Sequence, residues 1–346
     1  MTHDEKHRKR IEKYLKEIEG VYKNMIDAIS YVAVKIHLED ELFKFKNYSN
    51  IEVLADAIFL KYAKDVYEII TKGTASEWKL ANLKHDAIKQ ATIERISDRL
   101  NADVDLKNFA KSLHNETALE AFQRRKVGKF TISERVWDIG SKAKENIELA
   151  IDVALKEGMS AQELARQIKK ELNNPDALYR KVRDKHGNLK LSKAAKAYKP
   201  GQGVYRSAHK NALRLAANEI NIAYREAEQL RIIQNNDVVG QRISLSNSHV
   251  VRDMCDDLVG IYPKDFQWNQ WHTGCKCFRT TILKKDEEII KELNSGQNLP
   301  PETSANYVKE TPPQLHKWYA EKEERMQNWK SKPSFVENNK AVFKKS

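Results

Sequence analysis

HTGCKCFRTTIL, residues 272–283, ends the stretch 199–283 around which the rest of the chain is organised. All three cysteines of the protein lie within 23 consecutive positions of this stretch, from Cys255 to Cys277. Earlier in the same stretch, residues 238–245 read VVGQRISL, a run that is typical of a β-strand. We therefore expect any specialised chemistry of the chain here, and we expect the helices on either side to act as scaffold.

The N-terminal third of the chain is predicted to be helical. Apolar side chains recur at three- and four-residue steps over residues 8–38 and again over 51–70, as on one face of a helix. Gly73 is expected to end the second helix, and weaker helical patterning continues to Phe122. The near-heptad spacing of the first stripe suits packing in a core, or against another copy of the chain. We predict an N-terminal helical bundle over residues 1–123.

Capping signatures and composition place the later helices. The segment from Thr131 is predicted to cap a helix that stops at Gly158. Ser160 and Glu163 form a capping box that starts the next helix. The helix predicted over 212–234 carries several asparagines, which are poor helix formers because their side chains compete for backbone groups. These asparagines indicate either buried polar contacts to neighbouring loops or an exposed binding face.

Positive charge is concentrated in one part of the chain. The sequence has a formal net charge of +12, and residues 180–214 contain eleven Lys or Arg residues against one acid, Asp184. A turn at residues 186–188 and a short hairpin strand at 189–192 are predicted inside this region. Such a concentration favours contact with a polyanion, most simply nucleic acid, over a role in solubility alone. The candidate DNA-binding residues are Arg180, Lys181, Arg183, Lys190, Lys193, Lys196, Lys199, Arg206, Lys210 and Arg214.

The Cys/His cluster is a candidate metal site. Its four candidate ligands are Cys255, His272, Cys275 and Cys277, and the turn-forming Gly274 would let the last three converge. A Cys₃His set matches the closed, tetrahedral coordination of a structural zinc ion. Two other interpretations stay open: the cysteines are small buried hydrophobes beside a histidine that bonds a carbonyl, or they serve in a disulfide or redox role.

A hydrolytic site is the alternative for the same region. The residues that could hold a metal ion and activate water for attack on a phosphodiester are His249, Asp253, Asp256, Asp257 and His272. The two adjacent aspartates are also explained as part of a turn, so no catalytic residue is assigned. A metal-dependent nuclease or toxin-like enzyme that uses the His/Asp/Cys cluster at 249–277 is kept as the alternative function.

The sequence shows no apolar run near the roughly 20 residues that cross a bilayer. Its first residues, MTHDEK, lack the apolar segment of a signal peptide. We therefore expect residence in a cytoplasm and no membrane partner.

Several features of residues 199–283 occur together in one known family. The segments concerned are Asn218-Glu219, Val238–Leu245, Cys255–Gly260, His272–Cys277 and Thr280–Leu283. In this order they resemble the minor head proteins of tailed phages, the Mu protein-F-like head morphogenesis family. The resemblance extends more loosely back to residue 131. Arg252 stands where relatives often have a further cysteine, which leaves four candidate metal ligands, and Thr273 stands where a proline is usual.

The resemblance implies a fold and a set of partners. The fold would be mainly α with a small α+β C-terminal module: a helical bundle, then a Mu-F-like domain over 131–285 with its core at 199–283 and a short antiparallel sheet. A linker and a C-terminal helix would follow over 286–346. The partners would be the portal, capsid or scaffold proteins of a phage or prophage, together with double-stranded DNA.

The same resemblance implies a structural role rather than catalysis. The protein would act in capsid morphogenesis, DNA packaging and DNA ejection, inside the head or at its portal vertex, and would reside in the host cytoplasm during assembly. It would need no small-molecule substrate and no cofactor beyond a structural zinc ion. A zinc-stabilised adaptor outside any phage is a third interpretation of the residues.

Overall fold

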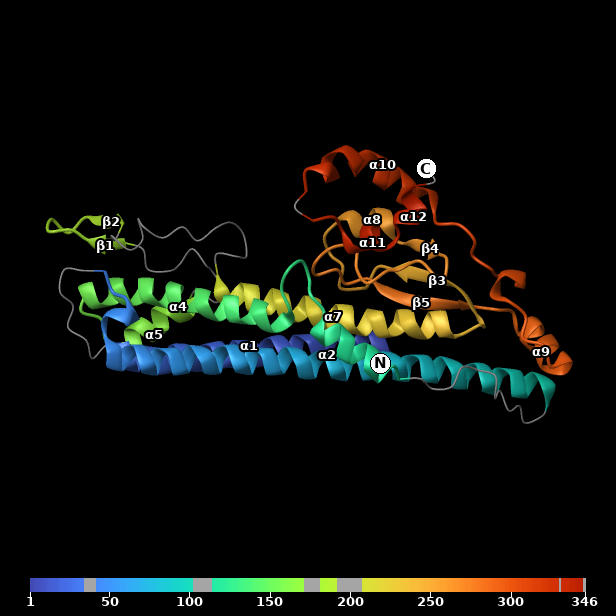
Figure 1. The fold of residues 1–346 in the computed structure, drawn as a ribbon, viewed down its shortest axis with the longest axis horizontal. Coiled ribbons are helices and arrows are strands. Elements are labelled where there is room, and N and C mark those ends of the chain that lie inside the picture. Colours follow the sequence, from blue (N-terminus) through green and yellow to red (C-terminus); the bar gives the residue numbers. More distant parts are fainter. Residues whose placement is uncertain (34–41, 102–113, 171–180, 192–206, 330, 345–346) are drawn as a thin grey trace. The chain divides into compact units, whose positions relative to one another are not determined.

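The computed structural model describes residues 1–33, 42–101, 114–170, 181–191, 207–329 and 331–344 (Figure 1). The α-helices are α1 (His3–Ala33), α2 (Ser49–Leu100), α3 (Glu116–Arg124), α4 (Ile132–Lys156), α5 (Ala161–Lys170), α7 (Ala208–Gln234), α8 (Met254–Leu258), α9 (Asp286–Ser295), α10 (Pro313–Gln327), α11 (Ser334–Asn338) and α12 (Lys340–Phe343). The short 3₁₀ helices are η1 (Phe45–Asn47) and η4 (Pro301–Thr303). The strands are β1 (Lys181–Arg183), β2 (Leu189–Leu191), β3 (Val238–Ser244), β4 (Gly260–Tyr262) and β5 (Phe278–Leu283).

The predicted fold class is confirmed, because the protein is mainly helical and has a small antiparallel sheet in its C-terminal part. Two compact units are formed by segments that are distant in sequence. The sheet unit consists of Met1–Arg8, Thr74–Phe122 and Asn218–Ser346, and the hairpin unit consists of Lys9–Gly73 and Gln123–Ala217. The predicted sequence boundaries of the domains stay a prediction. None of the described helices is both long enough and apolar enough to cross a membrane.

The hairpin unit buries much of the apolar stripe predicted on α1 but only part of the one predicted on α2, since Leu54 of α2 is 53% exposed. Ile26 and Ile29 of α1 are fully buried, as are Val66 and Ile70 of α2 and Ile147 of α4. The first stripe therefore packs in a core within the chain, at least over these positions. Apolar side chains at this spacing stabilise a helix mainly through the surface that they bury against their neighbours.

The expectation that Gly73 ends a helix is wrong. α2 continues without a break from Ser49 to Leu100, and Gly73 is a buried residue in its interior. A glycine inside a helix costs about 1 kcal/mol relative to alanine. Buried side chains on both sides, among them Ile70 and Trp78, offset this penalty.

Both predicted helix starts are confirmed. The Thr131 hydroxyl accepts a hydrogen bond from the Glu134 backbone, and the Glu134 carboxylate accepts one from the Thr131 backbone. Ser160 and Glu163 make the same reciprocal pair at the start of α5. Each pair satisfies two backbone donors that the first turn of a helix leaves free.

The predicted turn in the basic region is also confirmed. β1 and β2 pair as an antiparallel hairpin, with Val182 opposite Lys190. The Asp184 carboxylate closes the turn by accepting hydrogen bonds from the backbone nitrogens of His186 and Asn188, both at 2.9 Å. These backbone donors lower the pKa of Asp184.

A three-stranded antiparallel sheet lies at the centre of the sheet unit, in the order β4-β3-β5. Gln241 of β3 pairs with Tyr262 of β4 on one side and with Thr281 of β5 on the other. In Figure 1, α7 runs along one face of this sheet, and α8 lies with α10, α11 and α12 on the other. Gly240 of β3 leaves room for Val308, whose backbone nitrogen bonds to the Val239 oxygen at 3.0 Å, because a Cβ at position 240 would overlap Cγ2 of Val308.

The C-terminal helices belong to the core of the sheet unit. Leu315 and Trp318 of α10, Phe335 of α11 and Phe343 of α12 join one cluster of buried side chains with Trp271. All three cysteines are members of the same cluster. The residues that carry the Cys/His cluster are therefore set in an aromatic core rather than on an isolated loop.

Buried charges connect the first turns of α1 to the rest of the sheet unit. The ammonium of Lys84 pairs with Glu228 at 2.6 Å and with Asp4 at 2.9 Å, and it donates to the backbone oxygen of Arg279 at 2.8 Å. The Tyr224 hydroxyl also donates to Asp4, at 3.0 Å. Burial alone would lower the pKa of Lys84, but the two carboxylates outweigh it and raise the pKa.

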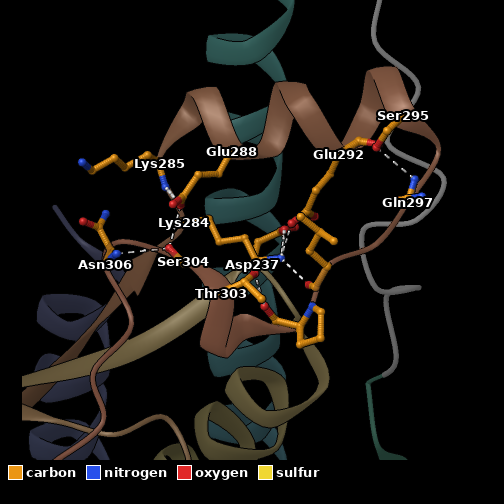
Figure 2. A network of polar contacts seen from close by, with 12 residues as sticks. Asp237, Lys284, Lys285, Glu288, Glu292, Ser295, Gln297, Thr303, Ser304 and Asn306 are labelled. Atoms are coloured by element: carbon orange, nitrogen blue, oxygen red, sulfur yellow. Dashed lines mark hydrogen bonds and ion pairs between the residues drawn. The ribbon is translucent and has the colours of Figure 1, made fainter.

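A second buried lysine anchors α9 and the chain that follows it. Figure 2 shows Lys284 between Asp237 and Glu292. Its ammonium lies 2.8 Å from Glu292 and 3.9 Å from Asp237, and it donates to the backbone oxygen of Leu299 at 2.8 Å. Only 1% of the Lys284 side chain is exposed, so the pairing is made almost entirely out of water.

Asp237 is the group in this network whose charged form is destabilised by burial. Loss of water around its carboxylate raises its pKa from 3.8 to about 6. The folded protein therefore holds a proton that the unfolded chain releases between about pH 4 and pH 6, and stability falls as pH rises through this window. A shift of this size corresponds to at most roughly 3 kcal/mol. We predict that Asp237→Asn raises the free energy of unfolding at pH 7.5 by about 1–3 kcal/mol, and that the gain disappears near pH 4.

Urea unfolding of the full chain at both pH values measures this difference. Asp265→Asn, at an exposed site in the same unit, is the control and should change little at either pH. A less stable Asp237→Asn protein at pH 7.5 would mean that the ion pair with Lys284 outweighs the cost of burial.

Candidate metal centre

Cys255 is held in the first turn of α8. Asp253 caps this helix, with its carboxylate accepting a hydrogen bond of 2.7 Å from the Cys255 backbone nitrogen. Asp256 completes a capping box by accepting from the Asp253 backbone at 2.8 Å. The short helix therefore fixes the direction of the Cys255 side chain, which is fully buried.

The other cluster residues lie on the segment that leads into β5. A turn is closed by a hydrogen bond of 3.1 Å from the Cys275 backbone nitrogen to the His272 oxygen. Gly274 within it has a φ of +80°, in the left-handed region that side chains other than glycine rarely adopt. The turn folds the segment back, so that His272 and Cys275 both approach Cys255.

The structure brings three of the four predicted ligands together, namely Cys255, His272 and Cys275. Nε2 of His272 lies 3.1 Å from Sγ of Cys255, and the Cys255 and Cys275 sulfurs are 3.8 Å apart. The ligand atoms of these three residues all lie within 4.8 Å of one another. Cys277 is buried in the same core cluster, but it does not belong to this group of three. This Cys/His cluster could bind a metal ion.

The histidine is oriented as a metal ligand requires. Its Nδ1 lies 2.9 Å from the backbone oxygen of Thr273, and a carbonyl can only accept, so Nδ1 carries the proton. Nε2 then faces the Cys255 sulfur and a carboxylate oxygen of Asp253, 3.0 Å away. The lone pair on Nε2 can accept the proton of the Cys255 thiol or bind a metal ion.

Among the three thiols, Cys275 is the one whose pKa is lowered. Hydrogen bonds from Cys255 and Cys277 lower the pKa of Cys275, and the nearby Arg225 guanidinium lowers it further. The pKa of Cys255 is raised, because its thiol bonds to Cys275 and Cys277 in the protonated form. Metal ions bind the thiolate rather than the thiol, so the lowered pKa of Cys275 favours metal binding.

α7 supplies the polar contacts that hold the loop of the cluster. Arg225 donates to the backbone oxygens of Asn269, Cys275 and Cys277 at 2.9, 2.8 and 2.7 Å. Gln229, one turn later, donates to the backbone oxygen of Lys264 at 3.0 Å. Arg225 and Gln229 thus contact neighbouring loops, whereas Asn221, one of the asparagines behind the prediction, bonds to His7 of α1 at 2.9 Å.

The residues of the hydrolytic alternative are placed close to the same cluster. Ligand atoms of His249, Asp253 and Cys255 also lie within 4.8 Å of one another, and His249 is 2.9 Å from Asp256. However, Asp253 and Asp256 already accept the backbone hydrogen bonds that cap α8. Asp257 is exposed. The local structure accounts for the two capping carboxylates without a catalytic role.

The candidate DNA-binding residues are described only in part. Lys190 of β2 is exposed, as are Lys185 and His186 of the same hairpin. Lys210 and Arg214 of α7 are half-buried, and both take part in side-chain interactions. The remaining candidates lie outside the described residues or have side chains that are not described, namely Arg180, Lys181, Arg183, Lys193, Lys196, Lys199 and Arg206.

Sequence reasoning named the ligands of the cluster but missed the role of Arg225. The available signal was Arg225 among the polar side chains of the predicted helix, followed one turn later by Gln229. Its partners are backbone oxygens, which no side-chain motif reveals. Comparisons with protein-family models, curated proteins and solved structures found no match to this chain, so its function has to be argued from the residues themselves.

Proposed function

We propose that this chain is a structural minor head protein of a tailed phage or prophage, which contacts DNA non-specifically and is not an enzyme. In this role it acts in capsid morphogenesis, DNA packaging and DNA ejection near the portal. Its partners are portal, capsid or scaffold proteins and double-stranded DNA. The protein resides in the virion, and in the host cytoplasm during assembly.

The supporting observation is that the residues of the resemblance form one structural site. β3, the α8 turn with Cys255, the His272–Cys277 segment and β5 follow each other in the sequence and lie in the sheet unit, where Cys255, His272 and Cys275 form one cluster. Asn218-Glu219 lies on α7 in the same unit, and Glu219 is fully buried. Their common place in one unit is the observation that supports the proposal.

We also propose that the cluster holds a structural zinc ion, bound by Cys255, His272, Cys275 and Cys277. With Zn–S bonds of about 2.3 Å, a tetrahedral site separates two sulfurs by roughly 3.8 Å. The Cys255 and Cys275 sulfurs lie 3.8 Å apart, a separation that suits such a site. Zinc would supply no chemistry in such a closed site, but would link α8 to the segment before β5.

DNA contact is proposed for the β1–β2 hairpin because of its exposed charge. Lys185 and Lys190 lie at its turn and on β2, and both side chains are exposed. A two-stranded ribbon of this kind fits the major groove of DNA. Contacts of lysine with phosphates carry no sequence information, so the binding would be non-specific and would weaken steeply as salt rises.

We predict that the double variant Lys185→Glu, Lys190→Glu binds duplex DNA at least about 10-fold more weakly at 100 mM salt. Each lost phosphate contact removes about 0.9 from the slope of log affinity against log salt, so the slope should fall by roughly 2. Fluorescence anisotropy with a 30-base-pair duplex at several salt concentrations, a length chosen at about three helical turns, measures both quantities. Lys309→Glu, Lys317→Glu changes the charge equally at exposed sites outside the hairpin and should bind more strongly than the hairpin variant.

A cleavage assay on the same purified protein distinguishes the head-protein proposal from the nuclease alternative. Plasmid DNA or RNA incubated with the protein and Mg²⁺, Mn²⁺ or Zn²⁺ should stay intact. Cleavage that turns over would refute the structural role in favour of a metal-dependent nuclease. Absence of the protein from purified phage particles, judged by mass spectrometry, would refute the assignment to a phage head.

A further inference from the structure

Arg225 of α7 points its guanidinium into the loop that carries the Cys/His cluster. The side chain is 4% exposed, and its contacts described above are all with backbone oxygens. Nη2 donates to Cys275 and Cys277 together, and Nη1 donates to Asn269. One planar group therefore fixes both cysteine residues of the Cys-x-Cys pair and a residue before His272.

We propose that Arg225 is the positioning residue of the metal site: it sets the backbone of Cys275 and Cys277 so that both sulfurs turn toward Cys255. This inference rests on the proposed zinc site. Arg225 does not contact the ligand atoms, and it acts through the two peptide groups. A rigid guanidinium fork can span two carbonyls, whereas a flexible ammonium acts as a single point of charge.

One neighbouring side chain, Trp268, holds the Arg225 guanidinium in place. The ring of Trp268 lies 4.7 Å from the guanidinium, as in a cation–π contact. Trp268 is itself buried and belongs to the cluster of core side chains. The positive charge stands next to thiols that become negatively charged when they bind a metal, so it also offsets charge in a buried site.

A purely structural role for Arg225 would predict a different result. If the arginine only joined α7 to the loop, its loss would lower stability but leave the metal affinity of the folded protein unchanged. Residues that orient metal ligands typically change the affinity by 10- to 100-fold when replaced. Zinc affinity of the folded protein is therefore the measurement that distinguishes the two roles.

The test uses the full chain with Arg225→Gln and Arg225→Lys. Competition with a chromophoric chelator should give zinc affinities about 10- to 100-fold weaker than wild type for Arg225→Gln. Arg225→Lys keeps the charge but loses the fork, and should also bind more weakly. With Co²⁺ in place of zinc, the sulfur-to-metal absorption band of either variant should be weaker or shifted, because the two sulfurs are no longer held in place.

Gln229→Ala is the matched control, since it removes a contact from the same helix to a part of the loop that carries no ligand. Its zinc affinity should stay within about twofold of wild type, well short of the change expected for a ligand-orienting residue. Wild-type affinity in both folded Arg225 variants would overturn this inference and leave the zinc site standing. Failure of the wild-type chain to bind zinc would instead remove the zinc proposal itself. If Arg225→Gln does not fold, Arg225→Lys decides the matter.

Discussion

Replacing Cys275 and Cys277 together by serine should leave the purified chain without bound zinc and lower its melting temperature by roughly 10 °C. Wild-type protein should carry about one zinc equivalent. Structural zinc contributes about 10–16 kcal/mol of apparent binding free energy in small finger peptides. Here an aromatic core already stabilises the same region, so we expect a smaller loss, of the order of 3–5 kcal/mol.

A chelator separates loss of metal from loss of two buried thiols. Wild-type protein treated with a strong zinc chelator should melt near the temperature of the double variant, and added zinc should restore it. The variant itself should not respond to either treatment. Less than about half an equivalent of zinc in native wild type, together with unchanged folding of the variant, would exclude a structural metal.

Local features of the fold could be predicted from the sequence, because their chemistry is complete within a few residues. The Ser160–Glu163 box is one example, and the turn around Asp184 is another, since donor and acceptor are separated by two to four positions. The Cys/His ligands were identifiable for the same reason: Cys275, Cys277 and His272 crowd into six positions.

Features that depend on distant residues could not be predicted in this way. Gly73 ends no helix because its neighbours are buried by other parts of the chain, which its own sequence does not reveal. Arg225 bonds to residues 44 to 52 positions away, and its partners are peptide oxygens. The pairing of Lys84 with Asp4 and Glu228 spans 80 and 144 positions.

The arrangement around Lys84 suggests how the first residues of α1 are held in the sheet unit. Beside the lysine, His7 lies between Glu77 at 2.7 Å and Asn221 at 2.9 Å, and its ring stacks on Tyr224 with centroids 4.0 Å apart. Glu77 is fully buried. These polar groups have lost their water, so each depends on its partner to avoid a desolvation penalty.

Lys84→Met should therefore be among the most destabilising single changes in the chain, costing about 3–5 kcal/mol of unfolding free energy. Methionine keeps much of the length of the side chain, but it leaves Glu228 without its cation and the Arg279 oxygen without this donor. Urea unfolding at pH 7 measures the loss. Lys79→Met, at an exposed position of the same helix, should change stability by less than about 0.5 kcal/mol.

A second substitution tests whether the loss comes from the charge left behind. Adding Glu228→Gln to Lys84→Met removes the carboxylate that lost its partner, and should recover about 1–3 kcal/mol, since the interaction of two contacting residues is not additive. Glu228→Gln alone should be destabilising, because it leaves the buried ammonium with Asp4 as its remaining carboxylate. If the two single changes simply add, Lys84 and Glu228 are not energetically coupled. In that case the network would hold the start of α1 by packing rather than by charge.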